Sequence, residues 1–280
     1  MARDTSFSYS FLVLPAEQRQ AIGLVWDFCR AVDDAVDEAP GESTATVELA
    51  KWRREVGRLF GAEAPLTPQG QHLKPVVAAF ALSRPPFDDL VDGVEMDLHH
   101  KRYQTFDELA GYCRRVASAV GLICIEIFGS RGTESSAYAD NLGLALQITN
   151  IIRDVAVDLK NGRIYLPQED LARFGVTEAD LQAGKVTVPI RKLLSHECQR
   201  ARQFYAAAAN AMPHADAHRL LAAEIMGGIY FEILQRIESR GFDVFTEVIR
   251  VPKAMRAWIA LTIWARGQLS AIGLRLSARA

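Results

Sequence analysis

Residues 147–158 (QITNIIRDVAVD) combine a polar stripe and an apolar stripe at helical spacing, and this stretch decides the predicted fold. Gln147, Asn150, Asp154 and Asp158 fall at i, i+3, i+7 and i+11, so they project from one side of a helix. The apolar stripe beside them is formed by Leu144, Ile148, Ile151, Ile152 and Val155. Because the helix is nearly apolar outside its polar stripe, we predict that it is buried.

Residues 26–37 (WDFCRAVDDAVD) repeat this pattern near the N-terminus. Trp26, Arg30, Asp33 and Asp37 fall at i, i+4, i+7 and i+11, again beside an apolar stripe. An unpaired buried carboxylate costs several kcal/mol. Two buried acidic stripes therefore need cations, and their hard oxygen ligands suit Mg²⁺.

A single pair of aspartates four residues apart is more often part of a solvated helix face or an ion-pair lattice. Two such pairs on apolar helices, with Arg30 near the first and Arg153 near the second, favour a functional site. Mg²⁺ prefers a few carboxylates together with substrate phosphates. Acidic stripe, metal and arginine together indicate a clamp for a diphosphate.

The composition is that of a globular protein with a substantial core: 280 residues, 49% hydrophobic and 24% charged. Helical periodicity dominates, and we find no alternation typical of strands. Pro, Gly and Ser clusters break the helices near residues 39–43, 61–70, 83–86, 129–136, 161–167, 184–189 and 212–216. We therefore predict one all-α domain over residues 1–280, with helices around a cavity suited to a long apolar ligand.

The cysteines and termini bear on where the protein works. The four cysteines show no metal-binding spacing, which favours small buried side chains in a reducing compartment. The N-terminus has no apolar signal segment, and no stretch approaches the ~20 apolar residues of a membrane span. We expect a cytoplasmic protein that does not bind nucleic acid.

The C-terminal segment, residues 250–280, holds six basic residues and no acidic ones, so it carries +6 while the rest of the chain carries −8. It also contains Trp258 and Trp264. One interpretation is a core helix with a basic exposed face. The other is a surface that rests on anionic lipid at the inner face of a membrane.

Several other residues have both a structural and a functional interpretation. Tyr112 lies on a helix with the small residues Ala117 and Gly121, which either admit another helix or leave room for a ligand. Phe7 and Phe11 precede the first long helix and either close over a substrate or plug the core.

Together, these motifs resemble the squalene/phytoene synthase family of head-to-head prenyltransferases. The matching stretches are residues 6–11 (SFSYSF), 28–38 (FCRAVDDAVDE), 102–106 (RYQTF), 112–121 (YCRRVASAVG), 147–158 (QITNIIRDVAVD) and 162–167 (GRIYLP). Residues 117–122 (ASAVGL), 125–129 (IEIFG) and 241–245 (GFDVF) are most similar to bacterial presqualene diphosphate synthases of hopanoid biosynthesis.

The resemblance implies an isoprenoid-synthase-type helical fold and a Mg²⁺-dependent reaction. Two farnesyl diphosphates would condense to presqualene diphosphate with release of diphosphate. A squalene, dehydrosqualene or phytoene synthase of the same family is an alternative. So is a catalytically silent binding subunit, or a helical membrane-interaction protein whose acidic stripes are ion-pair seams.

The resemblance also implies roles for individual residues. Asp33, Asp37, Asn150, Asp154 and Asp158 would hold Mg²⁺, and these aspartates and Tyr112 would act in catalysis, Tyr112 as an orienting or relaying hydroxyl. The substrate-binding residues would be Phe7, Phe11, Trp26, Arg30, Ala117, Gly121, Gln147, Asn150, Arg153 and Arg163.

The chain departs from the family pattern at three positions. Val157 replaces a glutamate, which leaves the metal-binding aspartates in place but weakens their surroundings. Trp26 and Phe242 stand where relatives often have tyrosine, so each lacks a hydroxyl that could reach a diphosphate.

Overall fold

The computed structural model describes residues 10–99, 102–213 and 215–277, with side chains to residue 268. In chain order the helices are α2 (Ala16–Asp37), α3 (Glu42–Phe60), α4 (Pro68–Ala79), α5 (Pro85–His99), α6 (Phe106–Cys113), α7 (Ala119–Phe128), α8 (Thr133–Lys160), α9 (Gln168–Phe174), α10 (Glu178–Gln182), α11 (Val188–Asn210), α12 (Leu221–Ser239) and α13 (Lys253–Ser277), with a π-helical segment, η1 (Arg114–Ser118), between α6 and α7. Within these residues there is no β-strand, only an isolated bridge between Arg102 and Ile164. The predicted all-α fold is confirmed.

The helices end where the sequence places Pro, Gly and Ser clusters, as the turns before α3, α4, α5, α8 and α11 show. The structure adds a connection over residues 240–252, between α12 and α13, that was not predicted. Gly241 and Phe242 both adopt positive φ there, 66° and 67°. Phe242 N donates to Ile237 O (2.9 Å) and thereby closes the end of α12.

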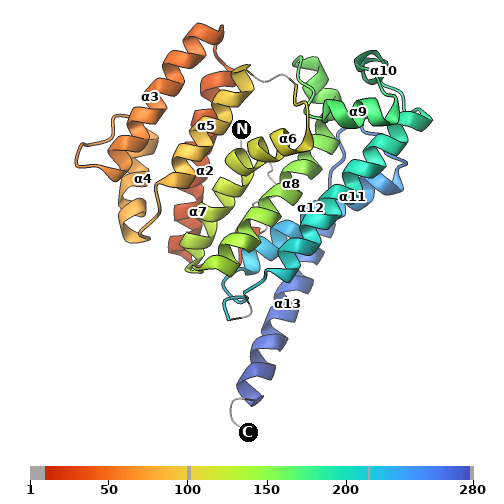
Figure 1. Ribbon diagram of the computed structural model, residues 1–280. Coiled ribbons are helices and arrows are strands. Elements are labelled where there is room, and N and C mark those ends of the chain that lie inside the picture. The colour runs from red at the N-terminus through yellow and green to blue at the C-terminus, as the bar shows by residue number, and fades with distance from the viewer. Residues whose placement is uncertain (1–9, 100–101, 214, 278–280) are drawn as a thin grey trace.

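The long helix α8 lies in the middle of the bundle, between α7 and α11 and against α12 (Figure 1). Its first half belongs to a core shared with α2, α3, α4, α5 and α7, to which it contributes Tyr138, Ala139 and Leu142. Its second half belongs to another core shared with α6, α9, α11 and α12, to which it contributes Leu144, Ile148, Ile151, Ile152 and Val155. The predicted apolar stripe of this helix is therefore buried.

Helix α2 buries one face and leaves the other partly exposed. Its buried residues are Ala21, Ile22, Val25, Phe28, Cys29 and Val32. Burial of each large side chain contributes about 1.5–3 kcal/mol, and this fixes the rotation of the helix. Asp33 and Asp37 project from the side next to the buried stripe.

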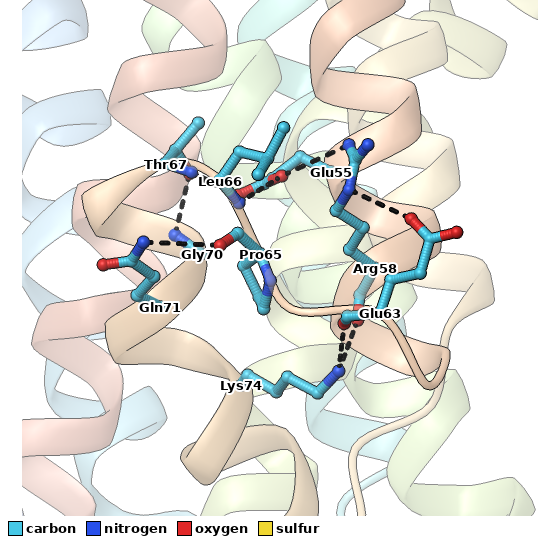
Figure 2. Close-up of polar contacts among 9 residues, drawn as sticks. All are labelled: Glu55, Arg58, Glu63, Pro65, Leu66, Thr67, Gly70, Gln71 and Lys74. Atoms are coloured by element: carbon cyan, nitrogen blue, oxygen red, sulfur yellow. Dashed lines mark hydrogen bonds and ion pairs between the residues drawn. The ribbon is translucent and has the colours of Figure 1, made fainter.

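The connection between α3 and α4 is held by one lysine and one buried glutamate (Figure 2). Lys74 Nζ donates to the carbonyls of Arg58 (2.8 Å) and Glu63 (2.6 Å). It also donates to the carbonyl of Gly61 (2.8 Å), and all three carbonyls lie at or beyond the C-terminal end of α3. The Glu55 carboxylate accepts from the backbone N–H groups of Leu66 (3.0 Å) and Thr67 (2.7 Å). The Lys74 bonds satisfy carbonyls at and beyond the end of α3, and the Glu55 bonds satisfy backbone N–H groups before α4.

Segment η1 is wedged between two glycines, a feature that the sequence did not predict. A Cβ added at Gly143 of α8 would lie 2.6 Å from Ser118 Cα, and one added at Gly93 of α5 would lie 2.7 Å from Val116 Cγ1. Ser118 Oγ donates to Asp140 O (2.9 Å) across the same contact. Both helices can approach η1 this closely only because they carry glycine here.

Helix α13 packs against α12 at its start and then extends beyond the rest of the bundle (Figure 1). Trp258 (62% exposed), Leu261 (54%) and Trp264 (44%) lie on its outer side. The interpretation of α13 as a core helix is therefore wrong for these three side chains. In the part of the chain that the structure describes, no helix has the length and hydropathy to cross a bilayer.

Candidate active site

Two adjoining cavities lie between α2, α5, η1 and α8. The polar one has a volume of about 430 Å³ and is lined by side chains from both acidic stripes, with Asp97 and Tyr112. The apolar one has a volume of about 560 Å³ and is lined mainly by α2, α7, η1 and the first half of α8. The two share Asp33, Asp37, Val116, Gln147 and Asn150, so they form one continuous space. Both volumes fall within the usual range for ligand-binding cavities.

The two predicted acidic stripes lie on different walls of the polar cavity. Asp33 and Asp37 come from α2, and Asp154 and Asp158 come from α8. Arg163, which follows α8, joins the walls, because its two terminal nitrogens each lie 3.2 Å from Asp37 Oδ1. Sequence spacing alone gave Arg163 no such partner.

Burial and mutual repulsion make these carboxyl groups reluctant to ionise. Burial, reinforced by the nearby charge of Asp37, raises the pKa of Asp33 from 3.8 to about 7. Burial and the charge of Asp154 raise the pKa of Asp158 to about 7. The Asp33 side chain is open to solvent within the cavity, while protein surrounds it on its other sides. The cavity therefore gathers carboxyl groups whose ionised forms a bound cation would stabilise.

The two predicted arginines differ in placement. Arg153 donates to its neighbour Asp154 through Nε (2.8 Å) and Nη2 (2.5 Å), and it lines the polar cavity. Arg30 lines the apolar cavity, and its Nε lies 3.7 Å from Asp34 with both side chains largely exposed. Such an exposed pair is weak, so Arg30 remains available to a ligand.

Asn150 supplies an observation that points to a ligand. Its Oδ1 is buried and accepts no hydrogen bond, while its Nδ2 lies 3.4 Å from Gln147 Oε1. A buried acceptor without a partner is costly, and this one belongs to the acidic stripe of α8. Among the described residues, no three Asp, Glu, His or Cys side chains converge closely enough to hold a metal by themselves. The donor set nevertheless fits Mg²⁺, which binds one or two carboxylates and completes its shell with substrate oxygens.

Tyr112 lies in the polar cavity, buried, with its hydroxyl donating to Asp97 Oδ2 (3.0 Å). Burial raises its pKa well above the ordinary value, and the charge of Asp97 adds to that effect. The hydroxyl of Tyr112 therefore stays protonated, and the phenolate that could act as a base is scarce. Tyr165 OH donates to the other oxygen of Asp97 (2.8 Å).

Asp97 is a site residue that the sequence analysis missed. It follows Leu90 and Val94 at helical spacing, and both of these side chains are buried. An aspartate on the buried stripe of α5 was the signal that could have identified it. Asp97 lacks the spacing of the two acidic stripes, because neither residue 93 nor residue 101 is an aspartate.

The remaining predicted residues are placed as follows. Phe11, Trp26, Ala117 and Gly121 line the apolar cavity, and Gln147 and Asn150 line both cavities. Phe7 lies outside the described residues.

The other two departures from the family pattern lie away from the cavities. Val157 is 40% exposed and lines neither cavity. Phe242 packs against the core shared by α6, α9, α11 and α12, with positive φ, and it also lines neither cavity.

Known proteins resemble this chain over most of its length. A phytoene synthase from Arthrospira platensis is 38% identical over 255 residues, covering 86% of this chain and 82% of that protein. A 15-cis-phytoene synthase from Synechococcus elongatus is 36% identical over 261 residues, covering 88% and 84%.

Solved structures agree in fold. A dehydrosqualene synthase in complex with a ligand superposes with a TM-score of 0.84 at 26% identity, covering 94% of this chain and 92% of that one. The squalene synthase HpnC from Alicyclobacillus acidocaldarius gives 0.77 at 31% identity, covering 85% and 89%. The squalene/phytoene synthase family profile matches residues 1–256. With this match and an isoprenoid-synthase-type helical fold, the chain belongs to the squalene/phytoene synthase family of prenyltransferases.

Proposed function

We propose that this enzyme condenses two farnesyl diphosphates head to head, giving presqualene diphosphate and free diphosphate. Head-to-head condensation of prenyl diphosphates is the reaction of its family. The observation that carries the proposal is the joining of the two cavities, one acidic and one apolar, at Asp33 and Asn150. The 31% identity to a solved squalene synthase supports the C15 substrate.

The polar cavity would hold the diphosphates. Mg²⁺ would be held by Asp33 and Asp37 on α2 and by Asn150, Asp154 and Asp158 on α8. When bound, it would neutralise the charge that develops on the departing diphosphate. Arg163 and Arg153 already lie in the cavity, each beside an aspartate. They would share this charge, and Arg30 would meet a diphosphate from the apolar side.

The apolar cavity would hold the prenyl chains. After the C–O bond of the donor breaks, the 2,3-double bond of the acceptor attacks the allylic cation, and loss of a proton closes the cyclopropane ring. Water would capture that cation, so a wall of residues such as Phe11, Trp26 and Ala117 protects it. The departed diphosphate is the proton acceptor we favour, with Tyr112 orienting or relaying. The raised pKa of Tyr112 keeps its hydroxyl protonated, so little phenolate is present to accept a proton directly.

Phytoene synthase is the second candidate, because two phytoene synthases are 38% and 36% identical to this chain. Incubation with C15 or C20 diphosphate and Mg²⁺, with and without NADPH, followed by mass spectrometry, separates the candidates. Presqualene diphosphate from the C15 substrate supports our proposal. Product from the C20 substrate alone contradicts it and identifies the second candidate.

We also propose that α13 holds this otherwise cytoplasmic enzyme against the inner face of a membrane, where hopanoid precursors dissolve. The exposed side chains of Trp258, Leu261 and Trp264 would enter the interface. The exposed Arg250 and Lys253 near the start of α13 complement anionic lipid.

Not every basic residue of the segment is available for this contact. Arg266 is exposed, but Arg256 is buried, with its Nε donating to Val251 O (2.8 Å). Arg256 is therefore not available to lipid, while Arg250, Lys253 and Arg266 are exposed.

Sedimentation with anionic and neutral vesicles tests the membrane proposal. We expect binding to anionic vesicles at low salt that falls at high salt and in a variant with Trp258→Ala and Trp264→Ala. Leu66→Ala is the control, because Leu66 is 70% exposed on the α3–α4 connection, away from α13. Absence of binding to anionic vesicles at low salt would exclude this surface.

A further inference from the structure

One carboxylate organises two tyrosines in the polar cavity. Asp97 Oδ2 accepts from Tyr112 OH (3.0 Å), and Asp97 Oδ1 accepts from Tyr165 OH (2.8 Å). The three residues come from three places: α5, α6 and the segment after α8. All three line the polar cavity. The arrangement therefore exists only in the folded protein and faces the site of the chemistry.

The tyrosine rings are also stacked. Tyr112 and Tyr165 have ring centroids 5.3 Å apart at 21°, and Tyr103 lies 6.0 Å from Tyr165 at 20°. Stacking fixes the ring planes, so each hydroxyl has only the rotation of its O–H bond left to set. The contact with Asp97 sets that rotation.

The hydrogen bonds from Tyr112 and Tyr165 to Asp97 determine which way the two hydroxyl protons point. An ionised carboxylate only accepts, so both tyrosine protons point to Asp97. Burial raises the pKa of Asp97 above its ordinary value, and the charge of Asp37 adds to that effect. The hydrogen bonds from Tyr165 and Tyr112 and the guanidinium of Arg163 oppose it and favour the ionised form. The geometry has both hydroxyls donating to the carboxyl oxygens. The two hydroxyls also lie within hydrogen-bonding reach of each other. With the protons turned to Asp97, the oxygen lone pairs that this contact does not engage are left for the rest of the cavity.

We propose that Asp97 is a positioning residue that turns the hydroxyl oxygens of Tyr112 and Tyr165, rather than their protons, toward the reacting prenyl chains. The inference rests on the proposed function, in which a carbocation forms beside these rings. A lone pair and an aromatic face stabilise a cation, and an O–H pointing at the cation would oppose it. Each oxygen of Asp97 is already engaged by a tyrosine, which separates its role from that of the acidic stripes.

Asp97→Asn tests the proposal with little change in shape. The amide has one accepting oxygen and one donating NH₂, so at least one tyrosine hydroxyl must turn. We expect kcat to fall about 100-fold, which is in the range for loss of one preorganised polar group. KM should change less than about threefold. The affinity of the enzyme for inorganic diphosphate, measured in the presence of Mg²⁺, should also change less than about threefold. Asp92→Asn is the control, since Asp92 lies on the same helix but pairs with Arg53 outside the cavity.

A second set of variants asks whether Asp97 acts through the tyrosines. In a Tyr112→Phe/Tyr165→Phe background, which keeps both rings, Asp97→Asn should lower kcat by less than about threefold further. An undiminished 100-fold loss in that background would overturn the proposal, as would a kcat within about threefold of wild type for Asp97→Asn alone. A loss of diphosphate affinity in Asp97→Asn would also overturn it, since Asp97 would then be a ligand. If Asp97→Asn does not fold, Tyr112→Phe and Tyr165→Phe must each lower kcat at unchanged KM.

A spectroscopic measurement separates failure of this inference from failure of the proposed function. The near-ultraviolet absorption of a tyrosine lies at longer wavelength when its hydroxyl donates to a carboxylate. We expect a blue shift in Asp97→Asn relative to wild type that is absent in the double phenylalanine background. An unchanged spectrum overturns the inference whichever substrate the enzyme uses. If the C15 substrate gives no product, the proposed function fails, and the same kinetic comparison is made with the C20 substrate.

Discussion

Gly143→Ala places a methyl group at the closest helix contact in the site. The new Cβ would lie 2.6 Å from Ser118 Cα, 2.7 Å from Ser118 N and 2.8 Å from Ser118 Oγ. Ordinary contact begins at 3.4 Å, so the nearest separation is short by 0.8 Å. Two of the three atoms are backbone and cannot rotate away. Helix α8 and η1 must therefore move apart, and overpacking of this kind costs about 1–3 kcal/mol of unfolding free energy.

The movement should also reach the site, because η1 carries Val116 and Ala117 and directly follows α6, which carries Tyr112. A displacement near 1 Å at a reacting group can lower a rate by about 100-fold. For Gly143→Ala we therefore expect kcat/KM to fall by about 10- to 100-fold. The free energy of unfolding should fall as well. A loss of both stability and kcat/KM in this variant would show that packing and catalysis are coupled through one glycine.

Urea unfolding followed by circular dichroism measures the first effect, and steady-state kinetics measures the second. Gly57→Ala is the matched control, because Gly57 lies within α3 and a Cβ there would meet nothing within 4 Å. That variant should gain about 0.5–1 kcal/mol from the helix preference of alanine and keep wild-type kinetics. Wild-type stability and kinetics in Gly143→Ala would refute the account of η1 as a tightly wedged segment.

The remaining predictions concern the cavities. Asp33→Asn or Asp154→Asn should each remove most turnover, because each deletes a hard anionic ligand; rates within about threefold of wild type in both would contradict the clamp. Ala117→Phe should impair use of the C15 substrate while the fold is kept, and unchanged kinetics would mean that this side chain faces protein. Because the pKa values of Asp33 and Asp158 rise from 3.8 to about 7 on folding, the folded state binds more protons between about pH 4 and pH 7. The free energy of unfolding of the metal-free protein should therefore fall as pH rises through that window, and urea midpoints of an Asp33→Asn/Asp158→Asn variant should show a flatter dependence.

The sequence predicted those parts of the site that a single helix determines. Asp154 and Asp158 share a stripe with Asn150 because helical spacing is a local property, and the structure places all three in one cavity. It did not predict Asp97, whose importance depends on Tyr165, a residue 68 positions away. It did not predict η1 either, because the π-helical register is imposed by contact with α5 and α8 and has no residue pattern of its own.

The far end of the apolar cavity gives a physical basis for chain-length selection. Of the α8 residues that line it, Tyr138 lies farthest from Asp154, 16 residues away, which is ~24 Å along the helix axis. Tyr138 is buried, and its hydroxyl donates to Glu224 Oε1 of α12 (2.6 Å), so the ring cannot easily swing aside. We therefore expect the C20 substrate to be the poorer one in the wild-type enzyme.

Tyr138→Ala should relieve that limit. Removing the ring lengthens the cavity, so the ratio of C20 to C15 product in a competition assay should rise by about tenfold or more, the effect of ~1.4 kcal/mol. Tyr138→Phe is the control, because it removes the bond to Glu224 but keeps the ring, and its ratio should stay near that of wild type. The same C20 to C15 ratio in Tyr138→Ala and Tyr138→Phe would show that the chain ends before this residue. In that event the depth of the cavity would be set nearer to the acidic stripes, at the level of Ala117 and Gly121.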